Sequence, residues 1–334
     1  MTEPTVSVLL PVRDCQAFLP AALDSILRQS FARWELVAVD DGSRDDTPRI
    51  LAEYACRDRR IRIITPVERG LVAALSAGLA LCRAPLVARM DADDISHPRR
   101  LEDQFVFLEE NPAVGLVACG FRHFPRHEVR VGMRAYERWQ NGLMTHDLIM
   151  RDLFVESPFV HPSVMFRKGP VLAAGGYRDH GWSEDYDLWL RLAAAGLRFA
   201  RLPAPLFFWR DRPERLTRTA PAYSAAAFRA CKIHYLKRGF LAENHEVTLV
   251  GAGLEGRAWM RTLAEVGIKV TRWIDADPRK QGRLLHGAPI LGPETDELSG
   301  KLLVTVGKRG AREGIRSWLA GRGLVEGVDV ICVT

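Results

Sequence analysis

Three carboxylates lie within four positions directly after an apolar run, in LVARMDADDISHPRRLEDQ at residues 86–104. Asp91, Asp93 and Asp94 repel one another unless positive charge lies between them. Hard divalent cations such as Mg²⁺ and Mn²⁺ prefer oxygen ligands of this kind, so the cluster predicts a metal site. A structural interpretation also stands, because Asp94 or Ser96 can cap the following helix, which has Pro98 in its first turn. A single Asp is enough for that cap, and the other two are left unexplained.

A second acidic turn follows another apolar run, in VDDGSRDDT at residues 39–47. The Asp-Gly-Ser segment forms a favourable turn and the Thr-Pro pair suits a helix start, so local structure alone accounts for it. The functional alternative is that Asp40 or Asp41 accepts hydrogen bonds from a base or a ribose.

A third group, Glu184, Asp185 and Asp187, begins the segment SEDYDLWLRLAAAG at residues 183–196. Carboxylates at a helix start interact favourably with its positive end, by about 0.3–1 kcal/mol each, which accounts for one or two of them. A carboxylate in this position is also able to act as a general base that deprotonates a hydroxyl group.

Strand-like and helix-like segments alternate around the first two clusters, which predicts a parallel sheet covered by helices. The strands are expected at residues 6–11, 34–40, 60–66 and 84–91, and the helices at 18–30, within 41–55 and at 70–82. Ligands of such sheets bind beyond the carboxyl ends of the strands. Because both acidic turns follow strand ends, we expect them to face one crevice.

The pattern changes after residue 98. Further helices are expected at 98–110, 137–155 and 184–196, strands at 114–121 and 162–168, edge strands interrupted by Pro203 and Pro205 at 197–210, and a basic amphipathic helix at 224–240. A second βα pattern begins at Glu246. We therefore expect a first domain at residues 1–243 and a second at 244–334.

The composition predicts a globular protein of a reducing compartment. Of 334 residues, 47% are hydrophobic and 26% charged, enough for two domains. No apolar run approaches the roughly 18 residues of a membrane span, and the first residues lack the basic start of a signal peptide, so the expected location is cytoplasmic. The cysteines have no CxxC spacing and are expected to be buried thiols rather than a zinc site or disulfides. They are Cys15, Cys56, Cys82, Cys119, Cys231 and Cys332.

The net charge of +6 favours anionic partners. The densest basic stretch is RHFPRHEVRVGMRAYERW at residues 122–139. A solvated surface explains mixed charge of this kind, and attraction to a phosphate-bearing substrate or to an anionic membrane surface is the alternative. Peripheral association with the inner face of a membrane is therefore left open. No nucleic-acid-binding motif accompanies the charge, so nucleic acid is not an expected partner.

An ordered set of motifs resembles bacterial family 2 glycosyltransferases. The motifs span about residues 5–215 and are VSVLLPVRD, ALDSILRQSF, ELVAVDDGSRDDT, GLVAALSAGL, ARMDADDISHPRRLEDQ, HPSVMFRK, GGYR and SEDYDLWLRL. The resemblance implies an inverting, nucleotide-sugar-dependent enzyme with the α/β GT-A nucleotide-diphospho-sugar transferase fold. It also implies a donor that is most often a UDP-sugar, a hydroxyl of a saccharide or lipid-linked acceptor, and a role in surface-polysaccharide assembly.

By this resemblance, the first acidic cluster is a DxD motif. Asp93 is expected to bind the Mn²⁺ or Mg²⁺ that bridges the two donor phosphates, and Asp91 to lie near the ribose. Asp41 corresponds to the residue that contacts the nucleotide base. Asp185 corresponds to the catalytic base, with Glu184 as its neighbour.

The same resemblance adds Pro11, Asp40 and Arg69 to the expected donor site. His161, in HPSVMF, is expected either to contact the metal or diphosphate or to be a structural hydrogen-bonding residue. The sequence also departs from the family. The Arg-Asp pair after the first Pro-Val stands where many relatives carry Tyr-Asn, which leaves the identity of the nucleotide base open.

The second domain carries Gly251, Gly253 and Gly256 between a predicted strand and helix, with Asp275 after the next strand. A dinucleotide-binding turn requires this context. The segment IDADPRKQGRLLHGAPILGP also resembles the small Rossmann-like domains of bacterial polysaccharide-biosynthesis proteins. Three interpretations are open: nucleotide or nucleotide-sugar binding, a scaffold or oligomerisation role, and NAD-dependent redox chemistry. The last is disfavoured because no hydride-transfer partner is visible.

Two other classes of function are weighed against a glycosyltransferase. One is an NAD-dependent sugar-nucleotide oxidoreductase built on the second domain. The other is a non-catalytic regulatory protein that binds nucleotide sugars through an inactive GT-A domain. The presence of Asp93 and Asp185 argues against an inactive domain. The sequence leaves open the donor sugar, the acceptor, the linkage and whether the chain forms an oligomer.

Overall fold

The chain folds into two compact units. The computed structural model describes residues 3–296, 298, 300–308 and 310–334. The first unit contains the residues up to Met150 together with Pro158–Thr219, and the second contains Arg151–Ser157 together with Ala220–Thr334. The division at Thr219 falls earlier than the boundary expected at 243/244.

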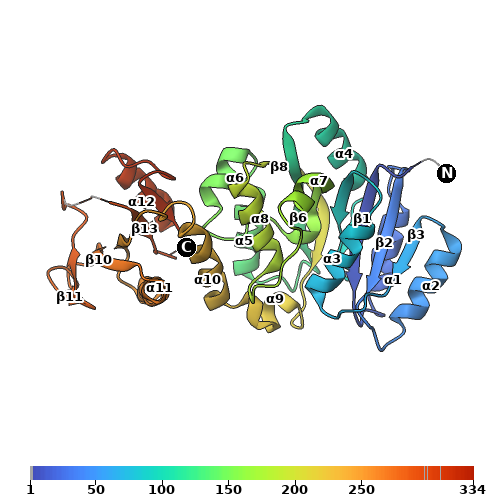
Figure 1. The fold of residues 1–334 in the computed structure, drawn as a ribbon, viewed down its shortest axis with the longest axis horizontal. Helices are drawn as coiled ribbons and strands as arrows, with labels where there is room; N and C mark the ends of the chain where they lie inside the picture. Colours follow the sequence, from blue (N-terminus) through green and yellow to red (C-terminus); the bar gives the residue numbers. More distant parts are fainter. Residues whose placement is uncertain (1–2, 297, 299, 309) are drawn as a thin grey trace. The chain divides into compact units, whose positions relative to one another are not determined.

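The strands of the first unit are β1 Val6–Val12, β2 Trp34–Asp40, β3 Ile61–Ile64, β4 Leu86–Arg89, β5 Ile95–Ser96, β6 Val114–Phe124, β7 Val164–Arg167 and β8 Arg198–Arg210. They form one eight-stranded sheet in the order β3-β2-β1-β4-β7-β6-β8-β5. Figure 1 shows β2 between β1 and β3 at one end of this sheet. The first four strands of this order are parallel, as the sequence predicts. β7 is antiparallel to both β4 and β6, and β5 is antiparallel to β8, so the other half of the sheet is mixed.

The helices of the first unit are α1 Leu19–Leu27, α2 Thr47–Arg57, α3 Leu71–Leu81, α4 Arg100–Glu110, α5 Val131–Asn141, α6 His146–Asp152, α7 Lys168–Ala173, α8 Glu184–Ala194 and α9 Leu216–Thr219, with a short 3₁₀ helix η1 at His161–Ser163. α1 and α2 each carry a proline in the first turn, where its missing N–H costs no hydrogen bond. α8 ends before Gly196, which has a φ of +77°.

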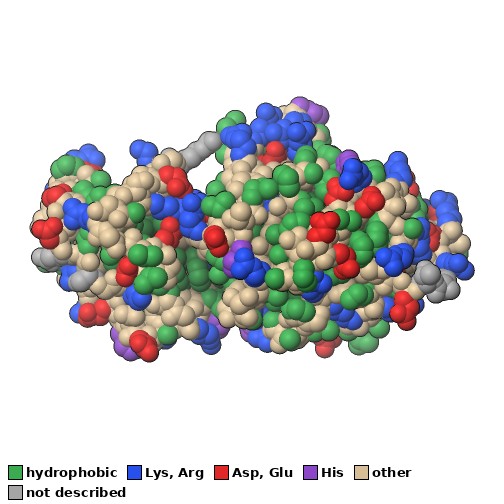
Figure 2. Space-filling model, turned by 90° about the horizontal axis from the view of Figure 1, so that it is seen from above, with side chains coloured by type: hydrophobic (Ala, Val, Ile, Leu, Met, Phe, Trp, Pro, Cys, Tyr) green, Lys and Arg blue, Asp and Glu red, His purple; other side chains and the backbone are tan. Residues whose placement is uncertain are grey.

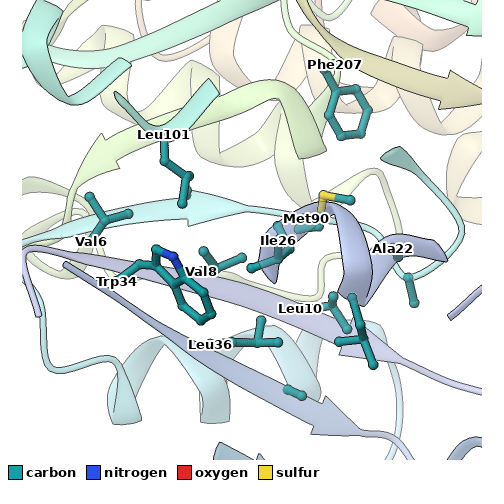
Figure 3. Packing of buried hydrophobic residues seen from close by; sticks show 14 of the residues in the cluster. Val6, Val8, Leu10, Ala22, Ile26, Trp34, Leu36, Met90, Leu101 and Phe207 are labelled. Atoms are coloured by element: carbon teal, nitrogen blue, oxygen red, sulfur yellow. The ribbon is translucent and has the colours of Figure 1, made fainter. Parts of the chain in front are cut away.

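The core on one face of the sheet is formed by alternate residues of the strands, because successive side chains of a strand point to opposite faces. Val6, Val8 and Leu10 of β1 pack in one buried cluster with Ile26 of α1 and with Met90 (Figure 3). Each fully buried aliphatic side chain of this kind stabilises the fold by about 1.5–3 kcal/mol.

Helix α3 covers the opposite face of the sheet. A Cβ atom added to Gly78 would lie 2.3 Å from Leu9 and 2.7 Å from Val39, so the helix approaches the two strands closely at a glycine. With helices on both faces, the carboxyl ends of the parallel strands are the part of the sheet left for a ligand.

The single helix expected at residues 137–155 is wrong, because the structure has two helices, α5 and α6, separated at residues 142–145. Asn141 ends α5 and is tied to β6: its amide accepts from the Phe121 N–H at 3.1 Å and donates to the Phe121 carbonyl at 2.9 Å. Gly142 follows and has low helix propensity. A contact with a distant strand therefore sets the end of this helix.

The interrupted edge strands expected at residues 197–210 are also wrong, because this segment is one continuous strand, β8, between β6 and β5. Pro203 and Pro205 lie where the register with β6 shifts around Gly120. Such a bulge accommodates residues that have no N–H for the ladder. A Cβ atom on Gly120 would lie 2.9 Å from the Pro203 carbonyl oxygen, so the bulge requires glycine there.

The second unit contains η2 Pro221–Tyr223, α10 Ala225–Leu236, β9 Glu246–Val250, α11 Leu254–Glu265, β10 Lys269–Ile274, β11 Leu284–Leu285, β12 Ala288–Leu291, β13 Leu302–Val304, α12 Ala311–Ala320 and β14 Val330–Cys332. Its six-stranded sheet has the order β11-β12-β10-β9-β13-β14. All neighbours are parallel except the β11–β12 hairpin. The predicted second α/β unit is therefore present.

Helix α10 explains why the units divide before residue 243. Ile233 and Leu236 of α10 are buried in the same hydrophobic cluster as Leu249 and Trp259 of the second unit. The segment Arg151–Ser157 joins this unit through Asp152, whose carboxylate pairs with Arg316 at 2.6 Å.

The face of the protein that Figure 2 shows mixes both signs of charge with hydrophobic side chains. In the basic stretch 122–139, Arg122 and Arg130 are exposed, whereas Glu137 is buried against Arg126 and His123. Five of the six cysteines are buried as expected, and Cys56 on α2 is exposed. In the part of the chain that the structure describes, no helix has the length and apolar character needed to cross a membrane.

Candidate active site

Two acidic turns lie at the same edge of the first sheet. The turns after the parallel strands β2 and β4 carry Asp40 and Asp41 and the cluster at residues 91–94. Buried Cys15 lies on the turn after β1, and its N–H donates to Thr47 Oγ1, at the end of the turn after β2, at 2.9 Å. Burial, then the nearby carboxylate of Asp93 and more weakly that of Asp45, raise the pKa of Cys15 to about 12. The two acidic turns therefore approach one region, as the topology predicts.

The second acidic turn is held by its own carboxylates. Asp40 Oδ1 accepts a hydrogen bond from the Ser43 N–H at 3.0 Å, and Asp41 Oδ1 accepts one from the Gly70 N–H at 2.8 Å. The guanidinium of Arg13 lies 3.6 Å from Asp41 Oδ2. The Asp41 carboxylate is a hydrogen-bond acceptor and the Arg13 guanidinium beside it is a donor. Together they match the alternating N–H and carbonyl groups on the edge of a pyrimidine base.

Arg69 lies against this same turn. A Cβ atom on Gly42 would lie 2.5 Å from Arg69 Nη1, and the φ of +73° at Gly42 favours glycine there. Pro11 is buried within β1, before the turn that carries Arg13. The next residue, Asp14, accepts a hydrogen bond from the Arg44 N–H at 2.7 Å and so links the turns after β1 and β2.

The three aspartates of the cluster have carboxylate oxygens within 4.8 Å of one another. Burial and then the charge of Asp91 raise the pKa of Asp93, and burial with both neighbouring carboxylates raises the pKa of Asp94 well above its usual range. Asp94 Oδ1 accepts from the Arg210 N–H at 2.7 Å, whereas its Oδ2 is buried and has no hydrogen-bond partner among the described residues. A buried carboxylate oxygen without a partner, beside two further carboxylates, fits a divalent cation.

The alternative role of this cluster, capping the next helix, is not observed. Helix α4 begins at Arg100 without a side-chain cap. Instead, guanidinium groups offset the negative charge: Arg89 lies 2.6 Å from Asp91, Arg212 Nε lies 2.8 Å from Asp93 Oδ2, and the charge of buried Arg215 lessens the rise in the pKa of Asp93 and Asp94.

Asp185 lies in the first turn of α8, beside Glu184. Its Oδ1 accepts hydrogen bonds from the Ser183 hydroxyl and, at 2.6 Å, from the Tyr186 N–H. Burial, followed by the carboxylate of Glu184, raises the pKa of Asp185 to about 6. A pKa near the working pH is what a general base needs.

His161 lies beside Glu184 rather than in the aspartate cluster. Its Nε2 is 2.8 Å from the hydroxyl oxygen of Tyr177, and its Nδ1 is 3.5 Å from Glu184 Oε1. Both ring nitrogens therefore face protein groups. The structure brings His161 to the pair that contains the expected base and does not group it with the carboxylates of residues 91–94.

Three residues of this site were missed by the sequence reasoning: Arg89, Tyr177 and Arg212. The sequence contains a signal for Arg89, because a charged residue inside an apolar strand needs a counter-ion and acidic residues follow it directly. Arg212 left none, since it is 119 positions away from Asp93.

The glycine turn of the second unit is built for close packing. Gly251 has a φ of +109°, and a Cβ atom there would lie 2.7 Å from Val306. A Cβ atom on Gly256 would lie 2.0 Å from the Gly251 carbonyl oxygen, whereas one on Gly253 would meet nothing within 4 Å. Packing therefore explains the first and third glycines and leaves the second unexplained.

Asp275 contacts the same turn. Its Oδ2 accepts hydrogen bonds from the Ala252 N–H and from Lys280 Nζ, both at 2.8 Å, and its Oδ1 accepts one from the Asp277 N–H at 2.9 Å. The side chain holds the glycine turn in place.

The first unit has the architecture of GT-A-type glycosyltransferases. The chain resembles the crystal structure of Staphylococcus aureus TarS 1–349 in complex with UDP-GlcNAc, with a TM-score of 0.57 at 15% identity, over 78% of this chain and 80% of that one. It also resembles the mannosyltransferase PcManGT from Pyrobaculum calidifontis in complex with GDP-Man and Mn²⁺, with a TM-score of 0.50 at 19% identity, over 80% and 70% of the two chains. At these identities the likeness shows the fold.

Sequence comparison gives the family. The pattern of the family described as Glycosyl transferase family 2 matches residues 7–172. The chain is 35% identical over 187 residues to the amylovoran biosynthesis glycosyltransferase AmsE of Erwinia amylovora, covering 55% of this chain and 67% of that protein. It is 30% identical over 225 residues to the O-antigen biosynthesis glycosyltransferase WbnJ of Escherichia coli, covering 66% and 85%. The chain belongs to glycosyl transferase family 2 and is a glycosyltransferase.

Proposed function

We propose that this glycosyltransferase moves a sugar from a UDP-sugar to a hydroxyl of a saccharide or lipid-linked acceptor in surface-polysaccharide assembly. The names of AmsE and WbnJ support the pathway. A further relative, 27% identical over 242 residues, is a UDP-Gal:α-D-GlcNAc-diphosphoundecaprenol β-1,3-galactosyltransferase of Escherichia coli, which supports a UDP-sugar donor and a lipid-linked acceptor. The pairing of Arg13 with Asp41 supports uracil, because together they offer a donor and an acceptor to its edge.

The observation that carries the proposal is the aspartate cluster with its unpartnered oxygen on Asp94. Asp93 would hold Mn²⁺ or Mg²⁺, with Asp94 beside it and Asp91 toward the ribose. When bound, the cation supplies positive charge that stabilises the departing diphosphate. This chemistry suits a nucleoside diphosphate leaving group, which gains negative charge as the glycosidic bond breaks.

Asp185 acts as the general base in this proposal. It accepts the proton of the acceptor hydroxyl as that oxygen attacks the anomeric carbon from the face opposite the diphosphate, which inverts the configuration. Glu184 holds a second negative charge beside it, and this charge raises the proton affinity of Asp185. His161 and Tyr177 position Glu184 through the contacts described above.

A product assay tests the function. The full chain is incubated with Mn²⁺, a panel of UDP-, GDP- and dTDP-sugars, and saccharide or lipid-linked acceptors, and the anomeric configuration of the product is read by NMR. We expect transfer from a UDP-sugar with inversion, and loss of transfer in the matched variant Asp93→Asn. A product of retained configuration would overturn the single-displacement mechanism.

For the second unit, we propose a scaffold role for Gly251, Gly256 and Asp275, because packing and backbone hydrogen bonds account for all three. Nucleotide or nucleotide-sugar binding at Gly253 is the alternative, and it is supported by the open space at that glycine.

A further inference from the structure

Among the described residues, two guanidinium groups form ion pairs with carboxylates of the aspartate cluster, and they differ in how firmly they are held. Arg89 belongs to β4, is 2% exposed, and donates both to Asp91 and to the Met90 carbonyl. The side chain of Arg212 is 33% exposed and lies two residues beyond the end of β8. Its guanidinium carbon also lies 5.4 Å from the centre of the Phe18 ring. Of the two groups, Arg212 is the one whose side chain is able to leave the cluster without disturbing the sheet.

Arg212 occupies one of the two carboxylate oxygens that Asp93 can offer to a cation. Its Nε lies 2.8 Å from Asp93 Oδ2, and Asp93 is the residue proposed to hold the divalent ion. Hydrogen bonds from Arg210 hold the backbone of the cluster. The Arg210 N–H donates to Asp94 Oδ1 at 2.7 Å, and Arg210 Nε donates to the Asp93 carbonyl, also at 2.7 Å. The cluster therefore keeps its shape whether or not the Arg212 side chain is present.

Charge balance argues that Arg212 and the cation do not share the cluster. Arg89, Arg210 and Arg215 already place positive charge beside the three carboxylates, so a divalent cation that binds while Arg212 stays would leave net positive charge in a half-buried site. Like charges at such separations repel strongly where water is scarce. A nucleoside diphosphate, in turn, brings negative charge that needs a counter-ion at the same strand edge.

We infer that Arg212 stands in for the divalent cation at Asp93 in the ligand-free enzyme, and that cation binding transfers its guanidinium to the donor diphosphate. The second half of this inference rests on the proposed function. A guanidinium suits both partners, because its planar fork of N–H donors matches carboxylate and phosphate oxygens alike. The same side chain thus opposes metal binding to the free enzyme and favours the bound diphosphate.

One variant tests the inference, because it should bind Mn²⁺ more tightly and UDP more weakly than the wild type. In Arg212→Gln, the affinity for Mn²⁺ without nucleotide, measured by the electron paramagnetic resonance signal of free Mn²⁺, is expected to rise about tenfold, as for loss of a competing charge-assisted hydrogen bond. The affinity for UDP at saturating Mn²⁺, measured by calorimetry, is expected to fall about tenfold. Arg212→Lys should show smaller changes of both kinds.

Arg99→Gln is the matched control. Arg99 forms an Arg–Asp pair of the same length, 2.8 Å to Asp103, on an exposed helix start. Its loss should leave both affinities within about twofold of the wild type. Unchanged or weakened Mn²⁺ binding by Arg212→Gln, in a preparation whose circular dichroism matches the wild type, overturns the stand-in role. Tighter Mn²⁺ binding with unchanged UDP binding overturns the transfer to diphosphate. A wild type that binds Mn²⁺ but no UDP overturns the proposed donor, while the nucleotide-free Mn²⁺ measurement still decides the role of Arg212.

Discussion

Replacing Asp185 by Asn is expected to stabilise the folded protein at neutral pH while removing most of its turnover. Asn has the same size, and its Oδ1 is still able to accept the hydrogen bonds of the Ser183 hydroxyl and the Tyr186 N–H. What the substitution removes is the negative charge beside Glu184 and the site that takes up a proton. Stability and activity therefore move in opposite directions.

The size of the stability change follows from the proton equilibrium of Asp185. Burial and the Glu184 charge raise the pKa of Asp185 from an ordinary value of 3.8 to about 6. At 1.36 kcal/mol per pH unit, ionising this side chain in the folded protein costs up to about 3 kcal/mol. Because Asp185 is only half-buried, solvent screening reduces this to about 1–2 kcal/mol.

The sign of the pH dependence is fixed by which state binds the proton more tightly. Between pH 3.8 and about 6 the folded protein keeps the proton of Asp185 and the unfolded chain has lost it. The free energy of unfolding of the wild type therefore falls as pH rises through this window. Asp185→Asn has no carboxyl to ionise at this position. Its free energy of unfolding should therefore equal that of the wild type below pH 3.8 and exceed it by the full amount above about pH 6.

Turnover of Asp185→Asn should fall by about 10²–10⁴, the range for loss of a general base. Donor affinity should change little, because the base acts on the acceptor. The wild-type kcat should rise with pH through about 6, where Asp185 loses its proton, and the residual rate of the variant should lack this rise.

The assay combines urea unfolding at about pH 4 and about pH 7 with kcat on the same preparations. Asp147→Asn is the control, because Asp147 is an exposed carboxylate in the first turn of α6. This control should lose about 0.3–1 kcal/mol of stability, because its side chain no longer carries the negative charge that interacts with the positive end of α6. Its turnover should not change. An Asp185→Asn protein that is destabilised like this control and fully active would refute the reasoning.

Asp93→Ala should remove the Mn²⁺-dependent gain in UDP affinity that calorimetry detects in the wild type, and an equal gain in both proteins would contradict the metal assignment. Gly256→Ala should destabilise the second unit by about 3 kcal/mol in thermal unfolding, because the new Cβ would lie 2.0 Å from a backbone oxygen. Gly253→Ala should change stability by less than about 1 kcal/mol, because no atom lies within 4 Å of the new Cβ. If the second unit binds nucleotide, an Asp93→Ala chain should retain a weak UDP site that Gly253→Val removes; absence of that residual site supports the scaffold role.

The sequence predicted the first half of the fold well because its signals are local. Apolar β-branched runs and helical spacing mark β1 to β4 and the helices between them, and parallel strands place their carboxyl ends together whatever the side-chain details. The end of α5 and the bulge in β8 were mispredicted because distant contacts set them. Asn141 bonds to Phe121 of β6, and the bulge packs against Gly120.

The candidate site divides in the same way. The sequence by itself determined which carboxylates cluster, since Asp91, Asp93 and Asp94 are neighbours in the chain and follow one strand. Only the tertiary structure decided what faces them. Arg212 comes from 119 residues away, and His161 lies beside Glu184 instead of the cluster, because the partner of a charge is whichever distant segment the fold brings within a few ångströms of it.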